Sequence, residues 1–315
     1  MTKLAANWSI LLMSQLMKGK FFLRPDIALG MGAQVANLIN RQGEVNAREK
    51  RRLEVTTISD SGKVKAFFYD DDDEDDEEED RKASIYDSVP TGSVARIPVK
   101  GTMLKYGTMC EYGMQEIGAF IQEAAAHKNI AAIVIDYDSG GGAVDAVAPL
   151  NHAVALAKSL GKPVVASIDM ACSAAYWSAS TTDYLVADND ISAEVGSIGV
   201  MMSFMDVKGY YEKEGIKLHT IYATESSDKN LAFQKALEGE YEMIREEELD
   251  PLARAFQQAV RTNRAGKLDE SVKGILNGKT FFAEQAKEYG LIDRVGNNNT
   301  AVEIALALAH ARQLL

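Results

Sequence analysis

Residues 129–142 read NIAAIVIDYDSGGG, an apolar run over 130–135 that leads into three consecutive glycines. Apolar side chains at successive positions indicate a strand that is buried on both faces, as in the centre of a parallel sheet. Apolar residues recur with helical spacing on either side of it, in MQEIGAFIQEAAAH (114–127) and over residues 146–160. The stretch therefore predicts a helix, a buried strand and a second helix in succession.

The same alternation continues outward from this unit. SVARIPVKG (93–101) reads as a preceding strand, KPVVASIDM (162–170) and YLVADND (184–190) as following strands, and residues 191–204 as further strands. A short helix is predicted from Ala174, and longer helices over 240–258 and 301–311. Strands that alternate with helices predict βαβ crossovers, so the fold class is α/β with a mainly parallel sheet and a helical C-terminal part.

Three units are predicted along the chain. Residues 1–68 are an N-terminal extension, mostly helical over 4–18 and 26–41, with short strands at VTTISD (55–60) and KVKAFFY (63–69). Residues 69–92 are an acidic, disordered linker, because residues 70–80 are all Asp or Glu and such a run repels itself. Its eleven charges supply most of the net charge of −12. A cation site is the weaker interpretation, since metal loops space their carboxylates with Gly or Asn. Residues 93–315 form the third unit.

The composition argues against several classes of protein. No basic stripe with interleaved aromatic residues is present, so nucleic-acid binding is not expected. The apolar stretch SILLMSQLM (9–17) is short and interrupted, so we expect no membrane span and a cytoplasmic location. The two cysteines, Cys110 and Cys172, form neither a metal-type pair nor a disulfide framework. No cofactor and no metal is expected.

Two segments carry the chemistry. DSGGG (138–142) ends a buried strand, where ligands of open α/β folds bind, and its peptide N–H groups suit a phosphate or an oxyanion. MACSAAYWSAS (170–180) places Ser173 where a strand passes into a helix, so Ser173 is a candidate nucleophile. On local sequence alone, a helix N-cap is the more common use of such a serine. Cys172 is an alternative nucleophile, although a small buried thiol is the simpler interpretation.

A serine nucleophile needs a proton acceptor. None of the four histidines has an adjacent carboxylate signature or falls between Ser173 and His219. A lysine serves when burial favours its neutral form. IYATESSDKN (221–230) supplies Lys229 after a predicted strand, although a solvated surface lysine is the alternative.

From about Ser93 to Val295 the chain resembles the protease IV / signal peptide peptidase A family, which includes phage head-maturation peptidases and has a Clp protease/crotonase-like fold. The similar segments occur in the family's order: VARIPVKGTM (94–103), DSGGG (138–142), ACSAAYWSAS (171–180), VGSIGVMM (195–202) and GKTFFAEQAKEYGLIDRVG (278–296). Gly140 replaces the proline of the family's D-S-P-G-G turn, and alanines replace the two glycines that follow the nucleophile.

The resemblance implies a Ser/Lys dyad that hydrolyses peptide bonds. It makes Ser173 the nucleophile, Lys229 the base and the amides of Gly141 and Ala174 the oxyanion hole. The family's S-G-x-x-K pattern places its lysine about two residues earlier and contains a glycine that is absent here. Lys235 is therefore the second choice of base, and Lys217 is the third.

Four functions follow as hypotheses. A phage or prophage head-maturation peptidase comes first, because no membrane anchor is evident; it would act in the bacterial host cytoplasm. The alternatives are a cytosolic peptide-degrading enzyme of the signal peptide peptidase type, a crotonase-type acyl-CoA enzyme, and a catalytically weak assembly or scaffold protein. The expected partners are a peptide or protein substrate, further copies in a homo-oligomer, and phage capsid or scaffold proteins.

Overall fold

The computed structural model describes residues 20–23, 52–59, 61–70, 84–107, 111–204, 206, 208–217, 219–297 and 299–314. The helices predicted over 4–18 and 26–41, and the acidic run beyond Asp70, lie outside these residues.

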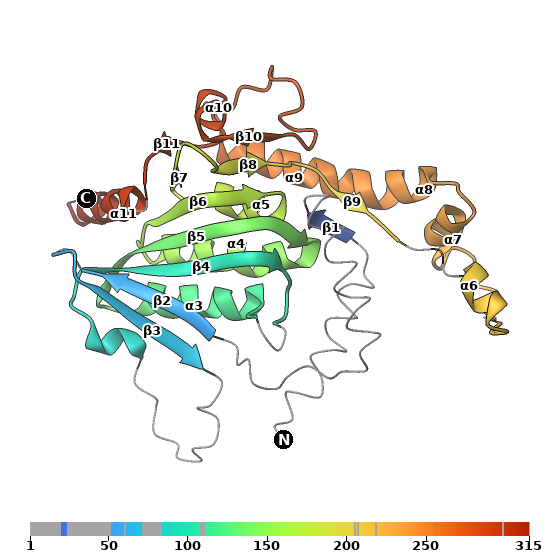
Figure 1. Cartoon of the computed structure of the whole chain (residues 1–315), viewed down its shortest axis with the longest axis horizontal. Coiled ribbons are helices and arrows are strands. Elements are labelled where there is room, and N and C mark those ends of the chain that lie inside the picture. Colours follow the sequence, from blue (N-terminus) through green and yellow to red (C-terminus); the bar gives the residue numbers. More distant parts are fainter. Residues whose placement is uncertain are drawn as a thin grey trace, which may run out of the picture.

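A parallel sheet forms the centre of the molecule (Figure 1). Strands β4 (Ser93–Met103), β5 (Ile130–Ala143) and β6 (Val164–Cys172) pair side by side in parallel, and both β7 (Tyr184–Ala187) and β8 (Glu194–Gly196) pair in parallel with β6. The crossovers from β4 to β5 and from β5 to β6 pass through α3 (Met114–Ala126) and α4 (Val147–Ser159). The predicted α/β class, with βαβ units and a mainly parallel core, is confirmed.

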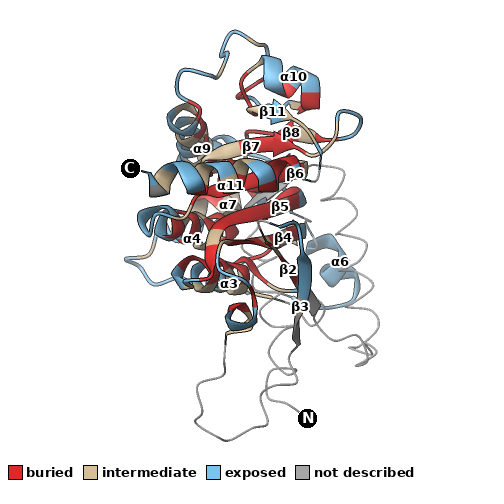
Figure 2. Cartoon of the chain, turned by 90° about the vertical axis from the view of Figure 1, so that its left-hand side faces the viewer, coloured by how far each residue is buried: buried red, intermediate tan, exposed pale blue. Residues whose placement is uncertain are grey.

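The helices lie on both faces of this sheet. α3 and α4 pack together against one face, where Ile121 of α3 and Leu150 of α4 are fully buried. α11 (Thr300–Gln313) covers part of the other face, over Val134, Val165 and Val186. In Figure 2 buried residues fill the central strands and the helix sides that face them. Layers on both sides explain why β5 reads as an apolar run without alternation.

The N-terminal strands belong to the same sheet. The two short strands predicted there are present as β2 (Arg52–Ile58) and β3 (Val64–Asp70). They form an antiparallel hairpin, and β2 pairs with β4. The 3-10 helix η2 (Ile85–Ser88) buries Tyr86 in the main core. The described residues before position 93 are thus continuous with the domain that begins there, whereas the sequence suggested separate units.

An arm extends from the sheet on the right of Figure 1. It consists of α6 (Lys208–Lys213), α7 (Leu231–Leu237), α8 (Glu242–Ile244), the π-helical turn Arg245–Leu249 and α9 (Asp250–Asn263). The strand predicted before Lys229 was wrong: residues 219–223 form no strand, and Ile221 is 94% exposed. A strand needs a hydrogen-bonding neighbour, and the described chain supplies none there.

Several short elements complete the fold. They are β1 (Lys20–Leu23), η3 (Val144–Ala146), α5 (Ala174–Ser180), β9 (Met201–Met202), β10 (Thr280–Phe282), α10 (Ala283–Glu288) and β11 (Arg294–Val295). Among the described residues, every helix is too short or too polar to cross a lipid bilayer.

Candidate active site

Ser173 occupies a strained turn between β6 and α5. Its φ of 58° and ψ of −120° are unusual for a residue with a side chain, and such conformations cost about 1–3 kcal/mol. Its N–H donates to the carbonyl of Gly196 at 2.8 Å, and its own carbonyl accepts from Trp177 N–H at 3.0 Å. The side chain makes no capping hydrogen bond, so the N-cap interpretation does not describe this serine. A strained serine on a strand-to-helix turn is the arrangement that presents a nucleophile in hydrolases.

The glycine turn of β5 lies beside Ser173. The parallel pairing of β5 and β6 sets Ser139 opposite Ala171, two residues before the serine. Gly141 has a φ of 103°, which favours glycine. Ser139 Oγ fastens the turn, because it donates to the carbonyl of Gly101 at 2.5 Å and accepts from Gly141 N–H at 3.2 Å. The latter bond is long, and it engages the amide that the resemblance assigns to an oxyanion hole.

The helix that follows Ser173 is anchored to the core. Ala174 is fully buried, Tyr176 Oη donates to the carbonyl of Leu291 at 2.8 Å, and Trp177 stacks on Phe256 of α9 with ring centroids 4.8 Å apart. Burial raises the pKa of the Tyr176 phenol, which therefore stays protonated at neutral pH. α5 is thereby held in place without contributing a proton acceptor of its own.

The described chain does not bring a base to Ser173. All four histidines are described, and none of them is hydrogen-bonded to Ser173; His127 binds Asp87 through Nε2 and accepts from Asn129 N–H through Nδ1. Lys229 and Lys217 are exposed, and Lys229 precedes α7 in the arm, away from the junction of β6 and α5 (Figure 1). Hydrogen bonds from Lys235 to Glu238 and Glu240 raise its pKa. Within one chain, no described lysine is hydrogen-bonded to the serine.

The sequence did not predict β1, which lies between two segments that read as helices. β1 pairs antiparallel with the glycine turn, placing Phe21 opposite Ala143, Phe22 opposite Gly142 and Leu23 opposite Gly141. On its other edge it pairs with β9. The signal that was available is the sequence KFFL between Gly19 and Pro25, since Phe favours strands and Gly and Pro end them.

Part of the chain matches the model of a known peptidase family. The model of peptidase family S49 matches residues 156–312, a range that contains Ser173. The chain carries a domain of peptidase family S49. The predicted resemblance to the protease IV / signal peptide peptidase A family is confirmed.

Two relatives illustrate the range of the similarity. A protease 4 from Salmonella typhi is 29% identical over 224 residues, which are 70% of this chain and 35% of that protein. Capsid assembly protease C of Escherichia phage lambda is 26% identical over 230 residues, 70% of this chain and 50% of that protein. The chain therefore matches 35–50% of the length of these relatives. Among solved structures, a membrane-bound stomatin-specific protease has a TM-score of 0.44 and 14% identity, covering 67% of this chain and 82% of that chain.

A buried ion pair holds the end of the S49 domain. Arg264, 2% exposed, binds both oxygens of Asp293 at 2.9 and 3.0 Å, and Asp293 also accepts from Leu185 N–H at 2.8 Å and from Lys267. Burial alone would raise the pKa of Asp293, but the hydrogen bonds from Arg264 and Lys267 outweigh it and hold the pKa below its usual range. The pair ties the end of α9 to β7.

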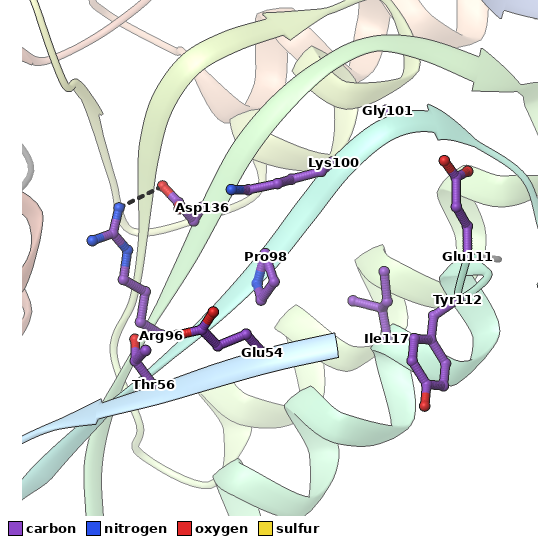
Figure 3. Close-up of a pocket in the computed structure, with 10 residues that line it drawn as sticks. All are labelled: Glu54, Thr56, Arg96, Pro98, Lys100, Gly101, Glu111, Tyr112, Ile117 and Asp136. Carbon is purple, nitrogen blue, oxygen red and sulfur yellow. Dashed lines mark hydrogen bonds and ion pairs between the residues drawn. The ribbon is translucent and has the colours of Figure 1, made fainter. Parts of the chain in front are cut away.

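A cavity of about 530 Å³ lies apart from Ser173, between β2, β4 and the start of α3 (Figure 3). Its charged lining residues are Glu54, Arg96, Lys100, Glu111 and Asp136. Arg96 donates to Asp136 at 2.9 Å, and burial raises the pKa of Glu111. Neither Ser173 nor any other residue of β6 or α5 lines this cavity.

Proposed function

We propose that this chain is a serine endopeptidase with Ser173 as its nucleophile. The observation that carries the proposal is the strained conformation of Ser173 beside the glycine turn, within a domain of peptidase family S49. The buried thiol of Cys172 faces the carbonyl of Glu194, which fits a packed side chain better than a nucleophile.

The reaction is acyl transfer in two steps. Ser173 Oγ attacks a peptide carbonyl while a base takes the hydroxyl proton, and that proton then leaves with the amine product. Water hydrolyses the resulting ester. The amides of Gly141 and Ala174 stabilise the oxyanion, as donors placed where the negative charge develops. Substrate binding must then draw the Gly141 N–H away from its long bond to Ser139.

We assign the role of base to Lys229. A lysine accepts a proton only as the neutral amine, and nearby carboxylates disfavour that form. Lys235 is held by two glutamates, whereas Lys229 has no side-chain partner in the described part of the chain. Because the arm carries Lys229 away from its own Ser173, a second copy has to supply and bury it. The active form is then a homo-oligomer.

The biological role that we propose is cleavage of capsid or scaffold proteins during phage head maturation, in the host cytoplasm. The similarity to capsid assembly protease C of phage lambda favours this role. The similarity to protease 4 supports the alternative, a peptide-degrading enzyme of the signal peptide peptidase type. A catalytically weak assembly protein would lack Ser173-dependent cleavage altogether.

The decisive experiment compares two adjacent substitutions. Ser173→Ala should remove peptide hydrolysis, a loss of several orders of magnitude in kcat. Cys172→Ala is the matched control, and it should keep the wild-type rate because the thiol takes no part. Circular dichroism and sedimentation verify that both variants fold and assemble. Hydrolysis by Ser173→Ala at the wild-type rate would refute the proposal.

A further inference from the structure

β2 pairs with β4 along only part of its length. The last described pair sets Thr56 of β2 opposite Arg96 of β4. The same register would next place Glu54 opposite Pro98, but proline has no N–H and cannot donate to a neighbouring strand. β2 keeps its full pairing with β3 instead. Beyond Arg96, no strand that the structure describes pairs with this edge of β4.

The cavity described above occupies the place of the missing pairs (Figure 3). Its volume of about 530 Å³ is typical of a ligand site, and β2 lines it through Glu54. β4 lines it from Arg96 to Gly101, which is six residues or about 20 Å at 3.3 Å per residue. The open edge of a strand presents N–H and C=O groups that bind an extended peptide by strand addition.

The two sides of this cavity differ in their chemistry. Side chains of a strand alternate between its faces, and Glu54 and Lys100 each lie an even number of residues from the last pair of β2 and β4. They therefore share one face of the sheet. Tyr112 and Ile117 line the cavity from the opposite face, where they belong to the main hydrophobic core. An extended peptide in the cavity would place every second side chain against this apolar side and the others beside the charged groups.

The charged lining residues carry an excess of negative charge. Three are carboxylates (Glu54, Glu111 and Asp136) and two are bases (Arg96 and Lys100), which leaves one negative charge in excess. Arg96 and Asp136 bind each other at 2.9 Å, whereas Glu54 has no side-chain partner in the described part of the chain. Burial raises the pKa of Glu111, so a positive charge placed beside that carboxyl would favour its ionised form. A ligand with one basic group matches this balance.

We infer that β4 binds an extended segment of a partner polypeptide along this open edge. Alternate side chains of the segment are apolar and pack on Tyr112 and Ile117, and one side chain on the other face is basic and pairs with Glu54. The site lies near the candidate active site, because only β5 separates β4 from β6 in the sheet. Gly101 connects the two places, since it lines the cavity and its carbonyl accepts from Ser139 of the glycine turn.

Fluorescence anisotropy of a blocked, fluorescein-labelled peptide, Val-Lys-Val-Thr-Val, tests this site on the full-length chain. The chain carries Ser173→Ala so that the probe stays intact. We expect saturable binding, with an affinity that falls about fivefold when glutamine replaces the lysine of the probe, as for one partly exposed ion pair. Glu54→Gln should weaken binding of the lysine probe by the same factor and leave the glutamine probe unaffected. Glu303→Gln, at an exposed position of α11 outside the cavity, is the matched control and should change neither affinity.

A second probe tests the hydrogen bonds to the strand edge. The same peptide methylated on every backbone nitrogen cannot donate to β4, and its affinity should fall by about tenfold or more. Failure of the lysine probe to saturate, equal binding of the methylated probe, or lysine-probe binding that Glu54→Gln leaves unchanged overturns the inference. Pro98 and Lys100 then only protect an exposed strand edge. These results do not depend on peptide hydrolysis, so the proposed function is judged separately.

Discussion

Gly142→Ala should damage both the sheet and the site. An added Cβ at this position would lie 1.9 Å from the carbonyl oxygen of Met103 and 2.6 Å from its carbonyl carbon. Ordinary contact begins at 3.4 Å, so the strands must separate by about 1.5 Å at this point. The obstacle is backbone, which no side-chain rotation can relieve.

The expected losses of stability and of rate follow from the close packing of β4 against β5. Forcing extra atoms into a packed interior costs about 1–3 kcal/mol, and a clash with backbone belongs at the upper end of that range. The separation also shifts the neighbouring Gly141, whose amide is assigned to the oxyanion. A displacement of about 1 Å in such a group lowers the rate about 100-fold. We therefore expect a loss of about 3 kcal/mol in unfolding free energy and a drop of about 100-fold in kcat/KM.

Urea unfolding and peptide hydrolysis measure these two quantities on the same preparation. The matched control is Gly209→Ala in α6, where an added Cβ meets nothing within 4 Å. Alanine is the better helix former by about 1 kcal/mol, so the control should be neutral or slightly stabilising. If Gly142→Ala unfolds at the same urea concentration as the control, the close approach of β4 and β5 is not the constraint described here.

Three further changes test other parts of the structure. Asp293→Asn should lower the free energy of unfolding in urea by about 3–5 kcal/mol at pH 7, because it leaves Arg264 buried and unpaired. The folded pKa of Asp293 is depressed, so this difference in stability from the wild type persists above about pH 4. It fades as the pH falls through the folded pKa. Lys229→Arg should abolish peptide hydrolysis, since arginine does not deprotonate, whereas Lys235→Arg should keep it; the opposite result in initial rates would make Lys235 the base. Ser139→Ala should cost about 1–2 kcal/mol in thermal or urea unfolding and lower kcat/KM, and unchanged values would show that the hydroxyl does not hold the turn.

The central elements of the fold were predictable because their patterns are long. β5 and the helices α3 and α4 each extend over many residues. Over such lengths the spacing of the apolar residues distinguishes a helix from a strand. Ser173 could be proposed from the sequence for a related reason: the strand, the serine and the small residues after it are contiguous in sequence. Its strained backbone and the absence of a capping bond needed the structure.

Elements that depend on distant partners were not predictable. β1 is four residues long and exists through pairing with β5 and β9, which lie more than a hundred positions away. The converse holds before Lys229, where strand-like residues find no partner and stay exposed. The packing of Tyr86 in the core was not predicted either. The acidic run that precedes it led us to interpret residues 69–92 as a disordered linker, although this linker contains a short buried segment.

α9 is attached to the rest of the domain at two places, and its outer end projects into the arm. Its fourteen residues, at a rise of 1.5 Å each, make a helix about 21 Å long. Arg264 and its buried pair clamp one end, and the aromatic stack on Trp177 supports the span. These two contacts hold α9 in place, and Trp177 lies four residues after Ser173. α9 and the turn that holds Ser173 are therefore attached to the same short helix, α5.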